Sequence, residues 1–531
     1  MANLLEHLMD NESKGVFCMS LYRKLLRAAR SPGQGDHLTD PDPLKAPPAS
    51  DSIAVNIGYL QHALCHTEDL KRQPLPFAGR DGTLVYLESL VDQDKIQLHV
   101  VQPLHENTSQ ELDNLFNILE TTRETPLDNA VKALIQGKCV YFLEGLQGFY
   151  ILATEAVYKR SVEEPQNEGV IRGPHYGFIE VLNVNLFLIR KLISSPYLTV
   201  RYFLAGTHTQ TRIAVVYMKN IANDELVREV EERIRAISAD AVLTTGIVQE
   251  ITEDHPFSMF PQHLATERPD RTASSLMEGR VAIITDGSPT VLIAPVTFFA
   301  FYQSPDDYNG RWIVSSFVRM IRMFSFLLAF TLPALYIGTV SFHPDILPLE
   351  LVHTIKSSLE RVPFPAIVEA MLLELIFELL REAGIRLPSR VGQTIGIVGG
   401  LVIGDAIVRA GLVSYTMIIV VSLTAIASFL VPSHEMSSAV RILRFPLMIA
   451  ASIFGYVGIA FGLMLLTIHL CKLESFGTPY FSPFAPLRIK DMKDVLVRFP
   501  SWLLNARPHD ADPKFMKQEE ATSRSWKRDE D

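Results

Sequence analysis

Glutamates at helical spacing are the first residues in this sequence whose types and positions could do chemistry. The segment 364–383 reads FPAIVEAMLLELIFELLREA, and acidic residues recur at intervals of four within its apolar run. At about 100° per residue, one face of a helix would carry Glu374, Glu378 and Glu382. Arg381 shares that face, whereas Glu369 points nearly opposite. Carboxylates in a membrane segment are costly, so they face a bundle interior, a partner or water.

Two arrangements of this acidic helix fit the pattern. In an oligomer, the acidic face could form rings of carboxylates that attract cations, which is a common electrostatic device of cation channels. Alternatively, the helix could lie on the membrane surface with its glutamates in water and with Arg381 paired to Glu378. Both arrangements remain hypotheses.

The next segment places glycine at every fourth position. Residues 392–411 read GQTIGIVGGLVIGDAIVRAG. The glycines that form this stripe are Gly392, Gly396, Gly400 and Gly404. In a soluble helix each interior glycine costs about 1 kcal/mol relative to alanine, whereas in lipid a bare backbone lets a neighbouring helix pack closely. The stripe therefore predicts a membrane helix, either packed statically or lining a pore or gate.

A charged pair follows the stripe. Asp405 and Arg409 are four residues apart, so on a helix they could form an ion pair that lowers the cost of both charges in lipid. A phosphate-binding loop does not fit this segment, because it contains neither GxGxxG nor GxxxxGK and its flanks are apolar. The sequence shows no Ser-His-Asp order, HExxH or CxxC motif, so it supports neither an enzyme nor a cofactor site.

Composition points to a protein with soluble and membrane parts. The chain has 531 residues, of which 48% are hydrophobic and 20% charged, and a formal net charge of −10. This negative charge argues against a general nucleic-acid binder. The four cysteines, Cys18, Cys65, Cys139 and Cys471, are scattered, so they indicate neither a disulfide framework nor a zinc site. His62, Cys65 and His66 lie close together, but we interpret them as part of a packed helix because a fourth ligand is missing.

The soluble part is expected to have an α/β fold in two small subdomains. Residues 1–51 form a proline-rich N-terminal extension, and residues 52–165 and 166–310 form the subdomains. Apolar runs at 84–87, 140–143 and 213–217 predict buried strands, and the periodicity of 224–237 predicts an exposed amphipathic helix. Strands that alternate with helices are typical of an α/β domain.

Beyond residue 311 the sequence predicts an α-helical polytopic membrane domain that ends near residue 471. Uncharged runs long enough to cross a bilayer occur at 323–342, 410–433 and 445–471. Arginines before the first run place the preceding domain on the cytoplasmic side. If 364–383 also crosses, both chain ends are cytoplasmic with about four crossings, plus an amphipathic or re-entrant helix. Residues 472–531 are then a cytoplasmic tail.

Several long stretches resemble the A-subunit family of spore germinant receptors. They include PFPAIVEAMLLELIFELLREAGIRLPSRVGQTIGIVGGLVIGDAIVRAGLVS, LTAIASFLVPSHEMSSAVRILRFPLM and LESFGTPYFSPFAP in the membrane part. In the soluble part, DGTLVYLESLVDQDKI, EPQNEGVIRGPHYGFIEVLNVNLFLIR and LMEGRVAIITDGSPTVLIAPVTFFAFYQSPDDY carry the same resemblance. Together they extend over about residues 80–490, and the proline-rich extension lies outside them.

The resemblance implies a cytoplasmic α/β domain followed by a membrane domain that oligomerises into a nutrient-gated channel for monovalent cations. It also implies two partners, a transporter-like B subunit and a lipoprotein C subunit, in the inner spore membrane. The glutamates of the acidic helix and the glycines of GQTIGIVGGLVIG stand where the family has them.

Two alternative hypotheses to the channel assign the chain to other classes of function. The chain could be a scaffold that clusters receptor subunits while ions pass elsewhere. It could also bind the nutrient in its own α/β domain. The sequence names neither the nutrient, the ion preference, the number of subunits nor the helix that lines the pore.

Overall fold

The structure is a computed structural model that describes residues 47–106, 120–156, 165, 167–360, 362–386, 406–407 and 409–518. The chain divides into two compact units, Met1–Pro47 and Pro48–Asp531. Everything described below belongs to the second unit.

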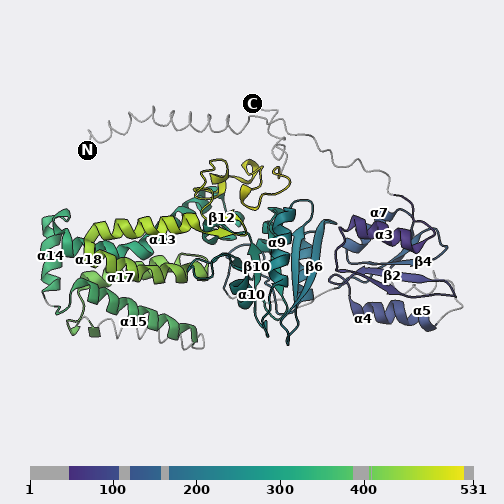
Figure 1. Ribbon diagram of the computed structural model, residues 1–531, viewed down its shortest axis with the longest axis horizontal. Coiled ribbons are helices and arrows are strands. Elements are labelled where there is room, and N and C mark those ends of the chain that lie inside the picture. The colour runs from purple at the N-terminus through teal and green to yellow at the C-terminus, as the bar shows by residue number, and fades with distance from the viewer. Residues whose placement is uncertain are drawn as a thin grey trace, which may run out of the picture. The chain divides into compact units, whose positions relative to one another are not determined.

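The first subdomain is a five-stranded antiparallel sheet between two layers of helices (Figure 1). Its strands are β1 (Leu70–Pro74), β2 (Gly82–Leu87), β3 (Thr121–Glu124), β4 (Cys139–Leu143) and β5 (Phe149–Leu152), in the order β1-β2-β4-β5-β3. One face packs on α3 (Ile53–Ala63) and α7 (Leu127–Ile135), and the other on α4 (Gln93–Ile96), η1 (Gln97–Val101) and α5 (Gln102–Glu106). Along β4 the side chains alternate between the two cores, so every residue of the strand is buried.

The second subdomain repeats this plan. Its strands are β6 (Leu198–Ala205), β7 (Thr211–Met218), β8 (Leu264–Thr266), β9 (Val281–Thr285) and β10 (Val291–Ala294), in the order β6-β7-β9-β10-β8. One face packs on α8 (Leu182–Leu192) and α11 (Pro269–Met277), and the other on α9 (Asp224–Arg235) and α10 (Thr245–Thr252). Both sheets thus have the same strand order, with helices at equivalent places in the chain. The soluble part therefore contains the same structural unit twice, once in each subdomain.

The expected strands at 84–87, 140–143 and 213–217 are confirmed as parts of β2, β4 and β7, and the expected helix at 224–237 is α9. The strands of both sheets pair antiparallel in every recorded ladder. Sequence periodicity predicted these elements, but neither their antiparallel pairing nor the repeat.

A buried ion pair joins the two subdomains. The Asp69 carboxylate, which lies next to β1, accepts a hydrogen bond from Arg190 Nε of α8 at 2.8 Å. Asp69 also accepts from Ser89 Oγ at 2.6 Å and from the Ser89 backbone nitrogen at 3.1 Å. Asp69 is fully buried, and a buried charge of this kind is tolerated only when it is paired and hydrogen-bonded.

The C-terminal half is dominated by helices. They are α13 (Trp312–Phe342), α14 (Leu349–Leu359), α15 (Ala366–Arg386), α17 (Tyr415–Phe429) and α18 (His434–Lys472). Among the described residues, α13 and α18 are long and apolar enough to cross a membrane, and α17 is a shorter apolar helix. Short elements link these helices or follow them: η2 (Phe298–Tyr302), α12 (Asp306–Asn309), η3 (Pro344–Ile346), β11 (Glu474–Ser475), β12 (Thr478–Pro479), η4 (Asp491–Asp494), η5 (Ser501–Leu503) and η6 (His509–Ala511).

The helix α18 is a hairpin of two antiparallel halves. Its backbone leaves helical geometry at Gly455, where φ is 59° and ψ is −137°, a conformation that favours glycine. A Cβ atom on Gly458 would lie 2.1 Å from the carbonyl oxygen of Ala450. In a straight helix, residues eight apart are separated by about 12 Å, so the chain must fold back at Gly455. The run 445–471, expected as one crossing, therefore contains a reversal.

Side-chain contacts give the directions of the two halves of α18. The first half of α18 (residues 434–454) begins beside the second subdomain, where Gln249 Nε2 donates to Glu435 at 3.3 Å. The second half (456–472) returns to the same subdomain, where Ser258 Oγ and His469 Nε2 are 3.0 Å apart. The reversal between them lies at the opposite end, because the Tyr456 ring stacks on His343 just after α13, with centroids 4.8 Å apart.

The residues after α18 are folded onto the second subdomain. Phe476 is buried in the core beneath α9 and α10, and Tyr480 is buried with its hydroxyl donating to the Pro261 carbonyl at 2.8 Å. Arg507 donates from Nε to the Met277 carbonyl at 2.6 Å. Within the expected tail 472–531, the described part up to residue 518 is thus a structured extension of that subdomain.

Candidate functional site

The acidic helix α15 packs against α17 and α18, and its carboxylates meet arginines. Glu374 forms an ion pair with Arg444 of the first half of α18, and their side chains are 3% and 5% exposed. Arg444 is seventy residues away in the sequence, and it reaches this position because α15 and α18 lie side by side. Glu374 is therefore part of a buried pair rather than an open acidic surface.

One turn further along α15, Glu378 forms an ion pair with Arg441 of α18. The Glu378 side chain is 45% exposed, so it still reaches the surface of this chain. The surface-helix hypothesis pairs Arg381 with Glu378. In the structure Arg381 Nη2 donates to Ser428 Oγ at 3.0 Å, and the Arg381 guanidinium lies 4.4 Å from the centroid of the Phe429 ring.

The remaining glutamates of α15 differ in their surroundings. Glu382 pairs with Arg386 one turn along the same helix at 2.6 Å, and both side chains are largely exposed. Glu369 is fully buried and accepts a hydrogen bond from the Ser414 backbone nitrogen at 2.9 Å, at the start of α17. The exposed carboxylates of this helix therefore cluster toward its C-terminal end, at Glu378 and Glu382.

Several buried atoms of this cluster have no hydrogen-bond partner among the described residues. They are Glu369 Oε1, Glu374 Oε1, Arg444 Nε and Arg444 Nη2. A buried polar atom without a partner costs about 1–3 kcal/mol. Water or another polar group beside these atoms would therefore stabilise the cluster.

The arginines of α18 are candidate site residues that the sequence reasoning missed. Arg441 and Arg444 lie three residues apart in RILRF, within an otherwise apolar helix, and this spacing puts both on one helix face. Charged residues at helical spacing inside an apolar run were the signal used for α15, and the same signal was present here.

The glycine stripe cannot be placed in the same way. Gly392, Gly396, Gly400, Gly404 and Asp405 lie outside the described residues. Arg409 is described, is exposed and takes part in an interaction. The stripe and the Asp405 to Arg409 pair therefore remain predictions.

His62, Cys65 and His66 do not all lie in one helix, whereas the sequence predicted that they would. The helix α3 ends at Ala63, and Cys65 and His66 follow in a turn with φ of 53° at both residues. The described part of the chain contains no group of three His, Cys, Asp or Glu residues placed to hold a metal ion.

A second charged cluster fixes the base of α13. Arg319 of α13 is fully buried and pairs with Asp307 of α12 at 3.2 Å and with Asp494 of η4 at 2.8 Å. Arg322 adds a contact to Asp307 at 2.9 Å. Arg498 donates to the Asp307 carbonyl oxygen at 2.8 Å. This cluster, which we call the α13 clamp, ties α13 to the soluble part and to the C-terminal extension.

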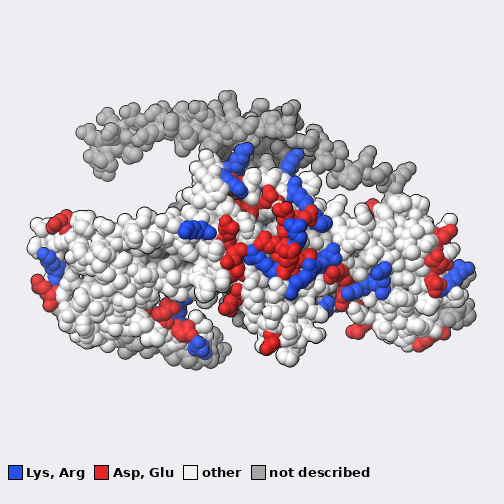
Figure 2. Space-filling view, viewed as in Figure 1, with Lys and Arg blue, Asp and Glu red and all other residues white. Residues whose placement is uncertain are grey.

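Arg319 and Arg322 are among the arginines just before the uncharged run 323–342, which the sequence assigns to the cytoplasmic side of a membrane helix. The structure gives them a second role, because Arg319 is buried and bound by two carboxylates. Elsewhere charged side chains gather over the soluble part, whereas the surface over α13, α17 and α18 is largely uncharged (Figure 2). That uncharged surface supports association of the helices with a membrane.

The chain matches known proteins over most of its length. The model of the family described as "Bacillus/Clostridium GerA spore germination protein" matches residues 58–510. "Uncharacterized membrane protein YfkQ" of Bacillus subtilis is 41% identical over 81% of this chain and 85% of that protein. "Spore germination protein A1" of B. subtilis is 40% identical over 84% of this chain and 93% of that protein. "Spore germination protein GerLA" of Bacillus cereus is 40% identical over 80% and 88%.

A solved structure also matches about half of the chain. It is the crystal structure of the N-terminal domain of the A subunit of the Bacillus megaterium spore germinant receptor GerK3. The sequences are 24% identical, the TM-score is 0.38, and the match covers 48% of this chain and 98% of that one.

Proposed function

Because the chain belongs to the Bacillus/Clostridium GerA spore germination protein family, we propose that it is the channel-forming A subunit of a nutrient receptor of spores. In this proposal several copies of the chain assemble in the inner spore membrane and open a path for monovalent cations when a nutrient is sensed. The transporter-like B subunit and the lipoprotein C subunit are its partners. The soluble repeat and the C-terminal extension then face the spore core.

The single observation that carries the proposal is the polar cluster within the helices. An intramembrane ionisable residue is a functional-site candidate by default, and α15 carries glutamates that meet Arg441 and Arg444 of α18. The exposed carboxylates, Glu378 and Glu382, are the ones available to form acidic rings in an oligomer. In this proposal the glycines at 392, 396, 400 and 404 remain the pore or gate candidates that the sequence offered.

The directions of the helices favour more passes than the sequence predicted. The helix α13 and the first half of α18 run away from the soluble part. The helices α15 and α17 and the second half of α18 run toward it. In this proposal the described helices cross the membrane more often than the about four crossings that the sequence predicted. Both ends of this bundle lie beside the soluble part, as a cytoplasmic location of both termini requires.

In this proposal the α13 clamp couples the soluble repeat to the membrane helices that open the channel. Asp307 and Asp494 belong to the soluble part and the C-terminal extension, and both bind Arg319 of α13. A rearrangement of the soluble repeat would therefore move the base of α13, which packs along α17 and α18. Packed elements of this kind switch between discrete arrangements rather than deforming gradually.

The test is potassium release from spores in which this chain, with its B and C subunits, is the sole nutrient receptor. The probe is a defined mixture of amino acids, sugars and nucleosides. The proposal predicts early potassium release that disappears when this chain is deleted and returns when it is restored. The purified chain should also conduct cations in planar bilayers.

The alternative function is a membrane scaffold that clusters receptor subunits. The large exposed apolar surface of the helices would suit it, because such surfaces mark interaction sites. A purified chain that forms oligomers but never conducts in bilayers would favour the scaffold and contradict the channel.

A further inference from the structure

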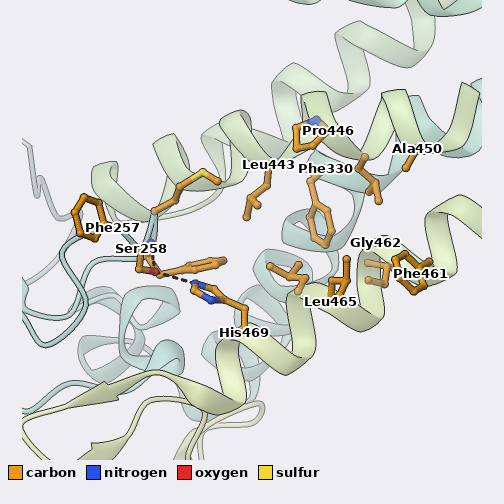
Figure 3. A pocket seen from close by; sticks show the side chains of 15 residues that line it. Phe257, Ser258, Phe330, Leu443, Pro446, Ala450, Phe461, Gly462, Leu465 and His469 are labelled. Atoms are coloured by element: carbon orange, nitrogen blue, oxygen red, sulfur yellow. Dashed lines mark hydrogen bonds between the residues drawn. The ribbon is translucent and has the colours of Figure 1, made fainter.

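An apolar cavity of about 430 Å³ lies where the α18 hairpin meets α13 and the loop before β8 (Figure 3). The first half of α18 contributes Leu447 and the second half contributes Gly462, and the two residues pack closely together in the wall of the cavity. Phe330 of α13 closes the inner side, and Phe260 of the loop closes the end nearest the soluble part. Such a cavity stays dry and takes up apolar molecules in preference to water.

One end of the cavity is polar. Ser258 Oγ and His469 Nε2 lie 3.0 Å apart at the end beside the second subdomain (Figure 3). Lys472, three residues after His469, is exposed at the end of α18. The opposite end, at Ala450 and Phe461, is lined by carbon. The cavity thus has the polarity of an amphiphile, with a head position near the soluble part and a tail position toward the hairpin reversal.

The surroundings of the cavity identify its occupant. Large apolar side chains that do not line the cavity are exposed on both halves of α18: Ile449, Ile453, Phe454, Val457, Met464 and Ile468. In a bilayer these side chains contact lipid tails, so the mouth of the cavity opens onto lipid. Phe257 is fully exposed at that mouth, where an aromatic ring suits the boundary between headgroups and tails.

We infer that this cavity binds one acyl chain of a phospholipid from the leaflet on the side of the soluble subdomains, with the headgroup beside Ser258, His469 and Lys472. A lipid held there would wedge the two halves of α18 against α13 and so tie the helix bundle to the composition of that leaflet. The inference rests on the membrane location in the proposed function.

The test uses the full chain in lipid nanodiscs that contain phosphatidylglycerol with a photoactivatable diazirine at the end of one acyl chain. Adducts are mapped by mass spectrometry. We expect them to concentrate on the cavity residues of the 443–450 and 461–469 segments. A second probe with the diazirine in the headgroup should label near Ser258 and Lys472. Gly462→Leu should abolish cavity labelling, because even a Cβ at this position would lie 2.6 Å from Leu447 Cδ1.

Two further variants keep the result interpretable. Ala450→Leu fills the opposite end of the cavity and should also remove the labelling, so a folding defect of one variant does not decide the outcome. Ala460→Leu adds the same bulk on an exposed position of the same half of α18 and should leave the labelling unchanged.

The remaining outcomes overturn the inference. Even labelling over all exposed apolar faces, unchanged by Gly462→Leu, would mean ordinary annular lipid only. Crosslinks from the cavity to a second copy of the chain would make it a subunit interface instead. A chain that does not enter the nanodisc bilayer at all would contradict the proposed function itself, which is a different failure from even labelling.

Discussion

Arg444 of α18 and Glu374 of α15 form a buried ion pair between two helices that are far apart in the sequence. The pair changes the meaning of the acidic helix. A carboxylate that the sequence offered as a pore charge is buried and paired within its own chain, and the exposed carboxylates of the helix are Glu378 and Glu382, each beside an arginine.

Breaking the buried pair from one side should be costly. We expect Arg444→Met to destabilise the purified chain by about 3–5 kcal/mol, because it leaves Glu374 as an unpaired buried charge. The double variant Arg444→Met with Glu374→Met should recover much of that loss, since neither charge remains. Arg386→Met, which removes the exposed partner of Glu382, should cost less than about 0.5 kcal/mol. Chemical denaturation in detergent measures all three, and equal losses for Arg444→Met and Arg386→Met would contradict the burial.

The α13 clamp should be needed for coupling between the soluble part and the helices. Arg319→Met removes the residue that binds both Asp307 and Asp494, so the C-terminal extension should loosen from α13. Hydrogen exchange at residues 491–500 should become faster, and nutrient-triggered potassium release should fall. Arg311→Met changes an exposed arginine just before α13 and is the matched control. Unchanged exchange in Arg319→Met would show that the clamp does not hold the extension.

The reversal at Gly455 predicts the labelling side of three cysteines. In a background without the other native cysteines, Cys471 and Ser433→Cys should react with a membrane-impermeant maleimide from the face that carries the soluble part. Phe454→Cys, beside the reversal, should react from the opposite face, together with Asp345→Cys as a reference for that side. If α18 crossed once without reversing, Ser433→Cys and Cys471 would instead be labelled from opposite faces.

The soluble repeat should show a pH dependence that originates at Cys139. Burial in the core of the first sheet raises the pKa of the Cys139 thiol to about 12, from about 8.5 in an unfolded chain. The folded state therefore holds the proton more tightly, and this contribution to stability is complete below about pH 8.5. It is lost progressively as the pH rises toward 12.

The measurement is the midpoint of urea denaturation at pH 8 and at pH 10.5, for the native chain and for Cys139→Ala. The native chain should lose more stability between these two pH values than the variant does. Alkylation of Cys139 at pH 8 should require unfolding, whereas the exposed Cys471 should react in the native state. Equal pH dependence of both chains would contradict the assignment.

Local patterns predicted much of the fold. The apolar runs of β2, β4 and β7 and the 3.6-residue period of α9 are properties of short segments, so they are visible in the sequence. The pairing of strands and the repeated strand order depend on contacts between distant segments. Periodicity carries no information about those contacts, and the repeat was therefore missed.

In the candidate site, too, local spacing could be predicted from the sequence, whereas contacts between distant segments could not. The spacing of Glu374, Glu378 and Glu382 on one helix face could be predicted. The partners of Glu374 and Glu378, however, are arginines of a helix more than sixty residues away. The reversal at Gly455 was also hidden, because a glycine within an apolar run looks the same whether the helix continues or folds back.

The most direct test of the channel account is the reversal potential of the assembled chain in a planar bilayer under a potassium chloride gradient. With Glu378→Gln and Glu382→Gln together, the account predicts that the reversal potential moves toward zero, because neutral rings select less well for cations. Glu225→Gln, on the exposed surface of α9, should leave it unchanged. A conductance and selectivity identical to those of the native chain, with both glutamates neutralised, would contradict the account.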